Sequence, residues 1–179
     1  MRDPRIRRFA IIMAVCYAVW YGVYDLWLMP DGRLDLWLSG KAAGWTATLL
    51  QAIGYDAVSR GGNEVWLGGR GIELIAECNG LAVLSLFVGF VLAFPGRWAR
   101  RMWFIPLGIA VIVAANVVRC AVLLGLLTRS DAAFEVGHGA GGLLFFYAIV
   151  FGLWVIWAQV GGEAEERSPD YAPAPVAAS

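Results

Sequence analysis

The chain contains only three cysteines (Cys16, Cys78 and Cys120) and a single histidine, His138. An odd number of widely spaced cysteines provides neither a disulfide framework nor a zinc-binding pattern. The formal net charge is zero, so overall charge points to no anionic partner. The arginines stand in short clusters beside apolar runs, so the sequence lacks the basic pattern that is typical of nucleic-acid-binding proteins. No metal and no organic cofactor is implied.

The chain is rich in apolar residues, which make up 60% of it, and its mean hydropathy is +0.65. Soluble domains average roughly 45–50% apolar residues. Here the apolar residues are gathered in long runs, which predict membrane-spanning helices rather than a large water-soluble core. We expect spans at about 9–29, 72–94, 102–127 and 143–160, within one membrane domain over 9–160.

The predicted fold is therefore an all-α polytopic membrane protein with four transmembrane helices. The outer segment 31–71 adds a helix over 36–53, whose mixed polar and apolar faces suit the membrane interface. Glycine pairs then separate two short β-prone pieces, 64–67 and 71–75, and predict a small β-hairpin on the outer face. Residues 161–179 are acidic, then rich in proline and alanine, and are expected to form a disordered cytoplasmic tail.

The basic residues predict the orientation, because short connections rich in arginine stay in the cytoplasm. The N-terminal residues 1–8 and the loop 95–101 are both basic. The first apolar run is longer than the roughly 7–15 residues of a signal peptide, so we expect it to be a retained span. Four spans then put both termini in the cytoplasm. The segments 31–71 and 128–142 lie at the outer face of the cytoplasmic (inner) membrane.

This topology brings three chemically useful residues to one membrane surface. Cys78 begins the second span, which enters from outside. Arg119 lies seventeen residues beyond Met102 in the third span, or ~25 Å into a hydrocarbon layer of roughly 30 Å. His138 precedes the fourth span, again outside. We therefore expect the three side chains to meet near the outer leaflet.

A thiol, a fixed cation and an imidazole are the parts of a nucleophilic cysteine site for acyl transfer. His138 would take the Cys78 proton and return it to the leaving amine. Arg119 would stabilise the charge that builds on the carbonyl oxygen. Asn116 shares a helical face with Arg119 and could orient it. Glu135 could hold one nitrogen of His138 if this loop is helical.

Three blocks carry a resemblance to a known family. The blocks are Glu77-Cys78-Asn79-Gly80, Asn116-Val117-Val118-Arg119 and His138. They resemble the signature blocks of the exosortase/archaeosortase family, which are a Cys-x-Gly block opening one helix, an Asn-x-x-Arg block in the next, and a downstream His or Arg. The resemblance covers about residues 36–160. The chain has fewer spans than full-length bacterial members and would be a short, stand-alone form.

The resemblance implies a membrane-embedded cysteine peptidase or transpeptidase. Its partners would be the lipid bilayer and membrane-anchored proteins with a C-terminal sorting signal (PEP-CTERM-like), made of a short motif, a transmembrane helix and a basic cluster. Carried across by position, Cys78 would be the nucleophile, Arg119 the stabiliser of the substrate carbonyl, and His138 the proton carrier. The acceptor could be water, an amine or a lipid headgroup.

Two other functions remain open. In a non-catalytic membrane scaffold or subunit, Arg119 and Glu77 would form a structural ion pair. In a small carrier or channel, the polar residues would line a path through the membrane. A single arginine within the spans and the lack of a polar run through any span disfavour the channel.

Overall fold

The computed structural model describes residues 4–166. The α-helices are α1 (Pro4–Trp20), α2 (Met29–Asp31), α3 (Arg33–Ala52), α4 (Leu81–Ala93), α5 (Trp98–Arg129), α6 (Asp131–Val136) and α7 (Gly142–Glu166). The strands are β1 (Ala57–Arg60), β2 (Glu64–Leu67) and β3 (Arg70–Glu73). The other helical turns are the π-helical η1 (Tyr21–Leu28), the 3-10 turn η2 (Ala76–Cys78) and the π-helical η3 (Gly137–Gly141).

Three of the described helices are long and apolar enough to cross a membrane: Ile6–Asp31, Trp98–Arg129 and Asp131–Gly161. They correspond to the first, third and fourth predicted spans. The second, predicted over 72–94, is α-helical only over Leu81–Ala93. These 13 residues extend about 20 Å at 1.5 Å per residue, less than the roughly 30 Å of the hydrocarbon layer. Four full-length transmembrane helices are therefore not confirmed.

The second predicted span is short because its first part does not form an α-helix. β3 ends at Glu73 and η2 covers Ala76–Cys78. Gly80 then begins α4 with a left-handed backbone (φ 80°), which glycine adopts without the steric cost of a Cβ atom. The polar, glycine-containing stretch before Leu81 therefore forms a connection between sheet and helix.

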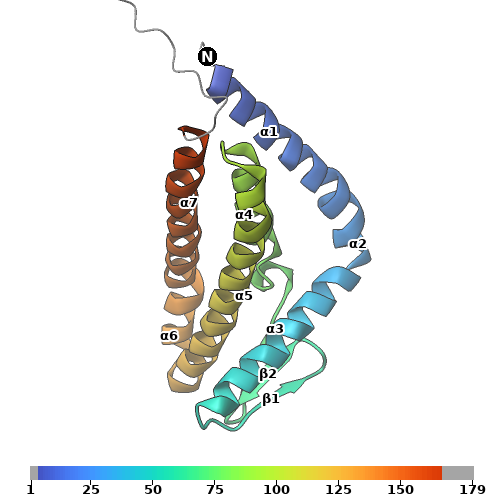
Figure 1. Ribbon diagram of the computed structural model, residues 1–179. Helices are drawn as coiled ribbons and strands as arrows, with labels where there is room; N and C mark the ends of the chain where they lie inside the picture. Colours follow the sequence, from blue (N-terminus) through green and yellow to red (C-terminus); the bar gives the residue numbers. More distant parts are fainter. Residues whose placement is uncertain (1–3, 167–179) are drawn as a thin grey trace, which may run out of the picture.

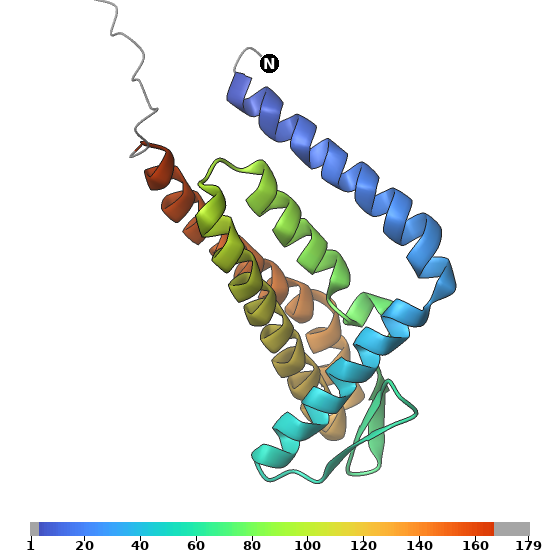
Figure 2. The same ribbon diagram turned by 45° about the vertical axis from the view of Figure 1, so that its right-hand side comes forward.

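The helices form a bundle in which α5 and α7 lie side by side and α4 packs against both (Figures 1 and 2). α1 runs along another side of α4. At Gly32, which has a left-handed backbone (φ 69°), the chain bends sharply into α3, which runs on toward the sheet (Figure 2) and packs on α5. The start of α1 and the end of α7 lie at one end of the bundle, and the sheet lies at the other (Figure 2).

The α3 helix confirms that the segment predicted over 36–53 is helical. Apart from Leu50, its buried face consists of small or polar residues that allow close approach to α5. They are Asp35, Ser39, Ala42, Ala43, Thr46, Ala47 and Leu50. Packing on α5 thus explains part of the mixed pattern that the sequence interpretation assigned to the membrane interface, and an interfacial location stays a prediction.

The outer segment contains one strand more than the predicted hairpin. β2 pairs with β3 in register Val65↔Ile72, as expected, and β1 adds an antiparallel partner in register Ala57↔Leu67. Ala57, Val65 and Leu67 are buried against α3 and the last turns of α5. The sequence interpretation missed strand β1 because its residues do not alternate between apolar and polar, and only Ala57 is buried.

An aromatic core joins α4, α5 and α7. The Phe104 and Trp157 ring centroids lie 5.0 Å apart, and Phe90 stacks on Trp154 at 4.6 Å. At the opposite end from the sheet, Arg101 donates to the carbonyl of Phe94 at the end of α4 (2.9 Å). Arg100 donates similarly to the carbonyl of Val160 in α7, so these two arginines tie the start of α5 to the end of α4 and to α7.

The predicted tail is only partly described. Helix α7 continues to Glu166, so it includes residues 161–166 of the expected tail. The remaining tail, 167–179, lies outside the described residues.

Candidate functional site

Cys78 lies in the connection between the sheet and α4. Its N–H donates to the carbonyl of Ile75 (2.8 Å), which closes the η2 turn. The next residue, Asn79, accepts a hydrogen bond from the Leu81 N–H at its side-chain oxygen (2.9 Å). Asn79 therefore satisfies one of the free N–H groups at the start of α4. Cys78 is half-buried, and the cysteines Cys16 and Cys120 lie elsewhere, in α1 and α5.

Asn116 holds the Cys78 backbone from α5. Its Nδ2 donates to the Cys78 carbonyl oxygen at 2.9 Å, and the residue is only 3% exposed. A Cβ atom on Gly80 would lie 3.6 Å from the same Nδ2, so the turn after Cys78 packs closely on Asn116. The sequence interpretation made Asn116 a support for Arg119, whereas its hydrogen bond goes to the segment of the predicted nucleophile.

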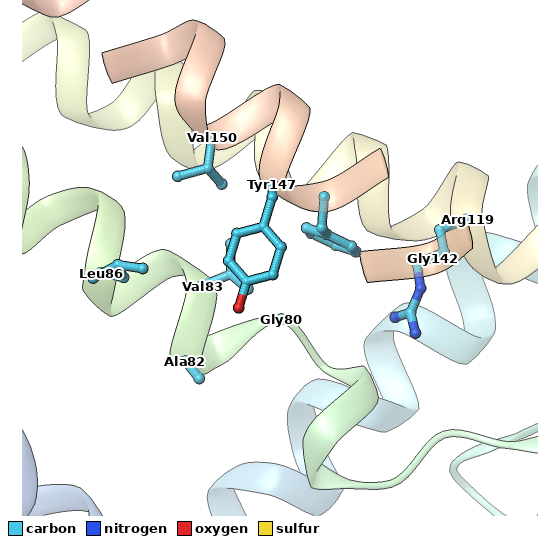
Figure 3. Close-up of a pocket in the computed structure, with 9 residues that line it drawn as sticks. Gly80, Ala82, Val83, Leu86, Arg119, Gly142, Tyr147 and Val150 are labelled. Atoms are coloured by element: carbon cyan, nitrogen blue, oxygen red, sulfur yellow. The ribbon is translucent and has the colours of Figure 1, made fainter. Parts of the chain in front are cut away.

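Arg119 lines a cavity of about 190 Å³ between α4, α5 and α7 (Figure 3). The other lining residues are Gly80, Ala82, Val83, Leu86, Gly142, Phe146, Tyr147 and Val150. The Arg119 guanidinium lies 5.4 Å from the Phe146 ring centroid, a cation–π contact. In Figure 3 the Tyr147 ring crosses the cavity with its hydroxyl turned toward the first turn of α4.

The Arg119 guanidinium has unused hydrogen-bonding capacity. Its Nε is buried and has no hydrogen-bond partner among the described atoms. Within the part of the chain that the structure describes, Arg119 takes part in no ion pair; those present are Arg33–Asp31 and Arg70–Asp131. Arg119 as a whole is half-buried, and a buried N–H without an acceptor is costly. This N–H is therefore free to donate to an oxygen that enters the cavity.

The predicted structural pair of Arg119 with Glu77 is not tested by these contacts. The Glu77 side chain lies outside the described side chains. That alternative therefore stays a prediction.

His138 is in the turn before α7, inside the glycine-rich η3 segment. Its ring is exposed and stacks on Phe134, with the centroids 5.4 Å apart. Gly142, four residues further on, lines the Arg119 cavity, but His138 is not among the described residues that line it. No hydrogen bond or ion pair joins Glu135 and His138 within residues 4–166, and Glu135 is exposed.

The structure therefore brings the Cys78 and Arg119 segments into contact, whereas the His138 segment lies only beside them. Gly80 and Arg119 line one cavity, and Asn116 bonds the Cys78 carbonyl. The His138 segment reaches the same cavity only through Gly142. The catalytic roles of Cys78, Arg119 and His138 stay predictions.

Sequence interpretation missed a buried carboxylate beside this site. Asp35 of α3 accepts a hydrogen bond from Asn79 Nδ2 at 2.6 Å and another from the Tyr24 hydroxyl at 2.8 Å. Asp35 is 7% exposed and Asn79 is 8% exposed. The available signal was the stripe Asp35, Ser39, Ala42 and Thr46, whose spacing places small and polar residues on one helical face.

A second, apolar cavity of about 730 Å³ lies between α1 and α4. Cys16 and Trp20 line it from the α1 side, and Ser85 and Gly89 line it from α4. The two cavities have Ala82 and Leu86 of α4 in common as lining residues.

Residues 4–155 match the family model of the transmembrane exosortases. No curated protein and no solved structure matches the chain.

Proposed function

The chain belongs to the transmembrane exosortase family, and from this premise we propose that it is a membrane-embedded cysteine peptidase or transpeptidase. Its substrates are membrane-anchored proteins with a C-terminal sorting signal. The observation that carries the proposal is the hydrogen bond from Asn116 to the Cys78 carbonyl. It ties the Cys78 segment to the helix that presents the Arg119 cation one turn further on, at a cavity bordered by Gly80.

The reaction begins when the Cys78 thiolate attacks the scissile carbonyl carbon. The carbonyl π electrons move to the oxygen, and the Arg119 guanidinium stabilises the resulting oxyanion. Collapse of this intermediate breaks the C–N bond, and the leaving amine takes a proton. The acyl group then remains on Cys78 as a thioester. Water or an amine attacks the thioester, releases the thiolate and completes hydrolysis or transpeptidation.

His138 is assigned as the group that takes the thiol proton and gives it to the leaving amine. This role rests on the order of the sequence blocks and on the imidazole being the only one in the chain. The His138 ring stacks on Phe134 at the protein surface, where a proton can also exchange with water.

The site is proposed to work at the outer face of the cytoplasmic membrane. Arg97, Arg100 and Arg101 lie in the connection before and at the start of α5, at the same end of the bundle as the start of α1 (Figure 2). Positive residues favour the cytoplasmic side, which leaves the Cys78 end facing outward. A membrane-anchored substrate would then reach Arg119 by lateral movement within the bilayer.

The experiment is processing of a co-expressed substrate with a C-terminal motif, helix and basic cluster. Cys78→Ser and Cys78→Ala should abolish cleavage while the protein accumulates in the membrane at the parent level. Cys16→Ser is the matched control, because this thiol lies in α1 and should be dispensable. Normal processing by Cys78→Ser would refute the proposed nucleophile.

Arg119→Gln separates the enzyme from the scaffold. In the enzyme, this variant accumulates in the membrane but cleaves at least about 100-fold more slowly, the usual effect of removing an oxyanion-stabilising group. In a scaffold that needs the Arg119–Glu77 pair, the amount of folded protein falls instead, and Cys78→Ser has no effect on function.

A further inference from the structure

We propose that Asp35 is a positioning residue for the Cys78 nucleophile and acts through Asn79. The inference rests on the proposed function, because it assigns a task to residues around the reacting thiol. Asp35 does not itself touch Cys78 in any described hydrogen bond. Asp35 accepts a hydrogen bond from the Asn79 side chain, and Asn79 directly follows Cys78.

The Asn79 side chain is held at both of its polar atoms. Nδ2 donates to Asp35 (2.6 Å), and Oδ1 accepts from the Leu81 N–H (2.9 Å). An amide fixed in this way cannot rotate without breaking a bond at each end. A hydrogen bond to a carboxylate is roughly twice as strong as one between neutral groups. The residue after Cys78 is therefore fixed in one orientation.

The network links three parts of the chain that are distant in sequence. The Tyr24 hydroxyl of η1 donates to the same Asp35 oxygen that receives Asn79. Asp35 belongs to α3, and Asn79 lies between η2 and α4. Helix α1, which continues into η1, and α4 are thus connected through a polar centre as well as through apolar packing.

A contribution to the stability of the fold is a poor explanation for a buried carboxylate at position 35. The residue is 7% exposed, and within residues 4–166 no cation forms an ion pair with it. Burying an ionised carboxylate without a cation costs free energy that two hydrogen bonds only partly offset. An apolar pair would stabilise the same contact between α3 and the start of α4 more simply, whereas a carboxylate sets a single direction for Asn79.

The two sides of Cys78 are therefore fixed independently. Asn116 holds its carbonyl from α5, and Asp35 holds the next side chain from α3. A nucleophile held in one geometry reacts faster without its substrate binding more tightly. Loss of the Asp35–Asn79 bond should consequently lower kcat and leave KM nearly unchanged.

The test is a reciprocal exchange of the two side chains in the full-length protein. Asn79→Asp keeps the oxygen that caps Leu81 but sets two carboxylates against each other, and we expect kcat to fall at least about 10-fold. Asp35→Asn removes the charge, and we expect a fall of about 3–10-fold. In the double variant the amide at position 35 can donate to the carboxylate at position 79, so kcat should return to within about 3-fold of the parent.

Each variant is purified in detergent and normalised to folded protein, and kcat and KM are measured on a sorting-signal substrate. Tyr24→Phe provides a milder change, because it removes one donor to Asp35 and keeps the ring. We expect it to lower kcat about 2–5-fold. It keeps the test decisive if either single variant accumulates poorly.

The inference is overturned if the single variants reduce only the amount of folded protein and leave kcat per folded molecule unchanged. It is also overturned if the double variant is no faster than Asn79→Asp. These outcomes are distinct from failure of the proposed function. If Cys78→Ser cleaves normally, the proposed function fails; if Cys78→Ser is inactive and the exchange shows no coupling, only the role of Asp35 fails.

Discussion

Asn116 and Cys78 are 38 residues apart in the chain, yet the Asn116 amide donates to the Cys78 backbone carbonyl at 2.9 Å. This bond joins the two sequence blocks on which the proposed site depends. Asn116 Oδ1 is buried without a partner among the described atoms, so the side chain is oriented by its donor alone.

Asn116→Asp should reduce substrate cleavage by about 10–100-fold, because a carboxylate cannot donate to the Cys78 carbonyl and leaves a buried acceptor unpaired. The measurement is the single-turnover cleavage rate of the purified protein. The matched control is Gln51→Glu, which makes the same chemical change at a side chain that donates to the Ala57 carbonyl (2.7 Å) beside the sheet. Equal loss in both variants would contradict a specific role for Asn116.

Gly142→Ala should displace the Arg119 guanidinium. A Cβ atom at position 142 would lie 3.1 Å from Arg119 Nε and 2.8 Å from the Gly137 carbonyl oxygen. We expect the cleavage rate to fall about 10-fold or more, since small displacements of a catalytic group have large effects on rate. Gly152→Ala is the control in the same helix, because nothing lies within 4 Å of its Cβ. Unchanged cleavage by Gly142→Ala would show that Arg119 tolerates the shift.

Gly108→Ala should destabilise the bundle without touching the site. Its Cβ would come within 2.1 Å of the Phe87 ring, and overpacking of this kind costs about 1–3 kcal/mol. The thermal unfolding midpoint in detergent should fall, whereas Gly125→Ala, with open space around its Cβ, should leave it nearly unchanged. The double variant Phe87→Leu/Gly108→Ala should recover part of the loss, and no recovery would argue against the Phe87 contact.

Cys78 should be the cysteine that reacts with a membrane-impermeant maleimide added from the outer side. It is half-buried, whereas Cys120 is 2% exposed and Cys16 lines the apolar cavity between α1 and α4. Single-cysteine variants, followed by mass spectrometry, give the labelling rate of each thiol. Labelling of Cys120 as fast as Cys78 would contradict this packing.

The apolar runs by themselves determined where most of the long helices lie. Spans predicted at 102–127 and 143–160 correspond to α5 and α7, since a run of apolar residues of this length has few other stable forms. The sequence blocks around Cys78 and Arg119 also indicated the family that residues 4–155 match. Both signals are local, so they can be read from neighbouring residues.

Only the tertiary structure decided how the Cys78 segment is held. Asp35 and Asn79 are 44 residues apart, and a hydrogen bond over that separation depends on how the chain bends at Gly32 and how α3 packs on α5. The same packing leaves α4 at 13 residues, because Asn79 and Gly80 form the connection that places Cys78 beside Asn116. Hydropathy records how apolar each residue is, and it carries no information about which buried polar groups will find each other.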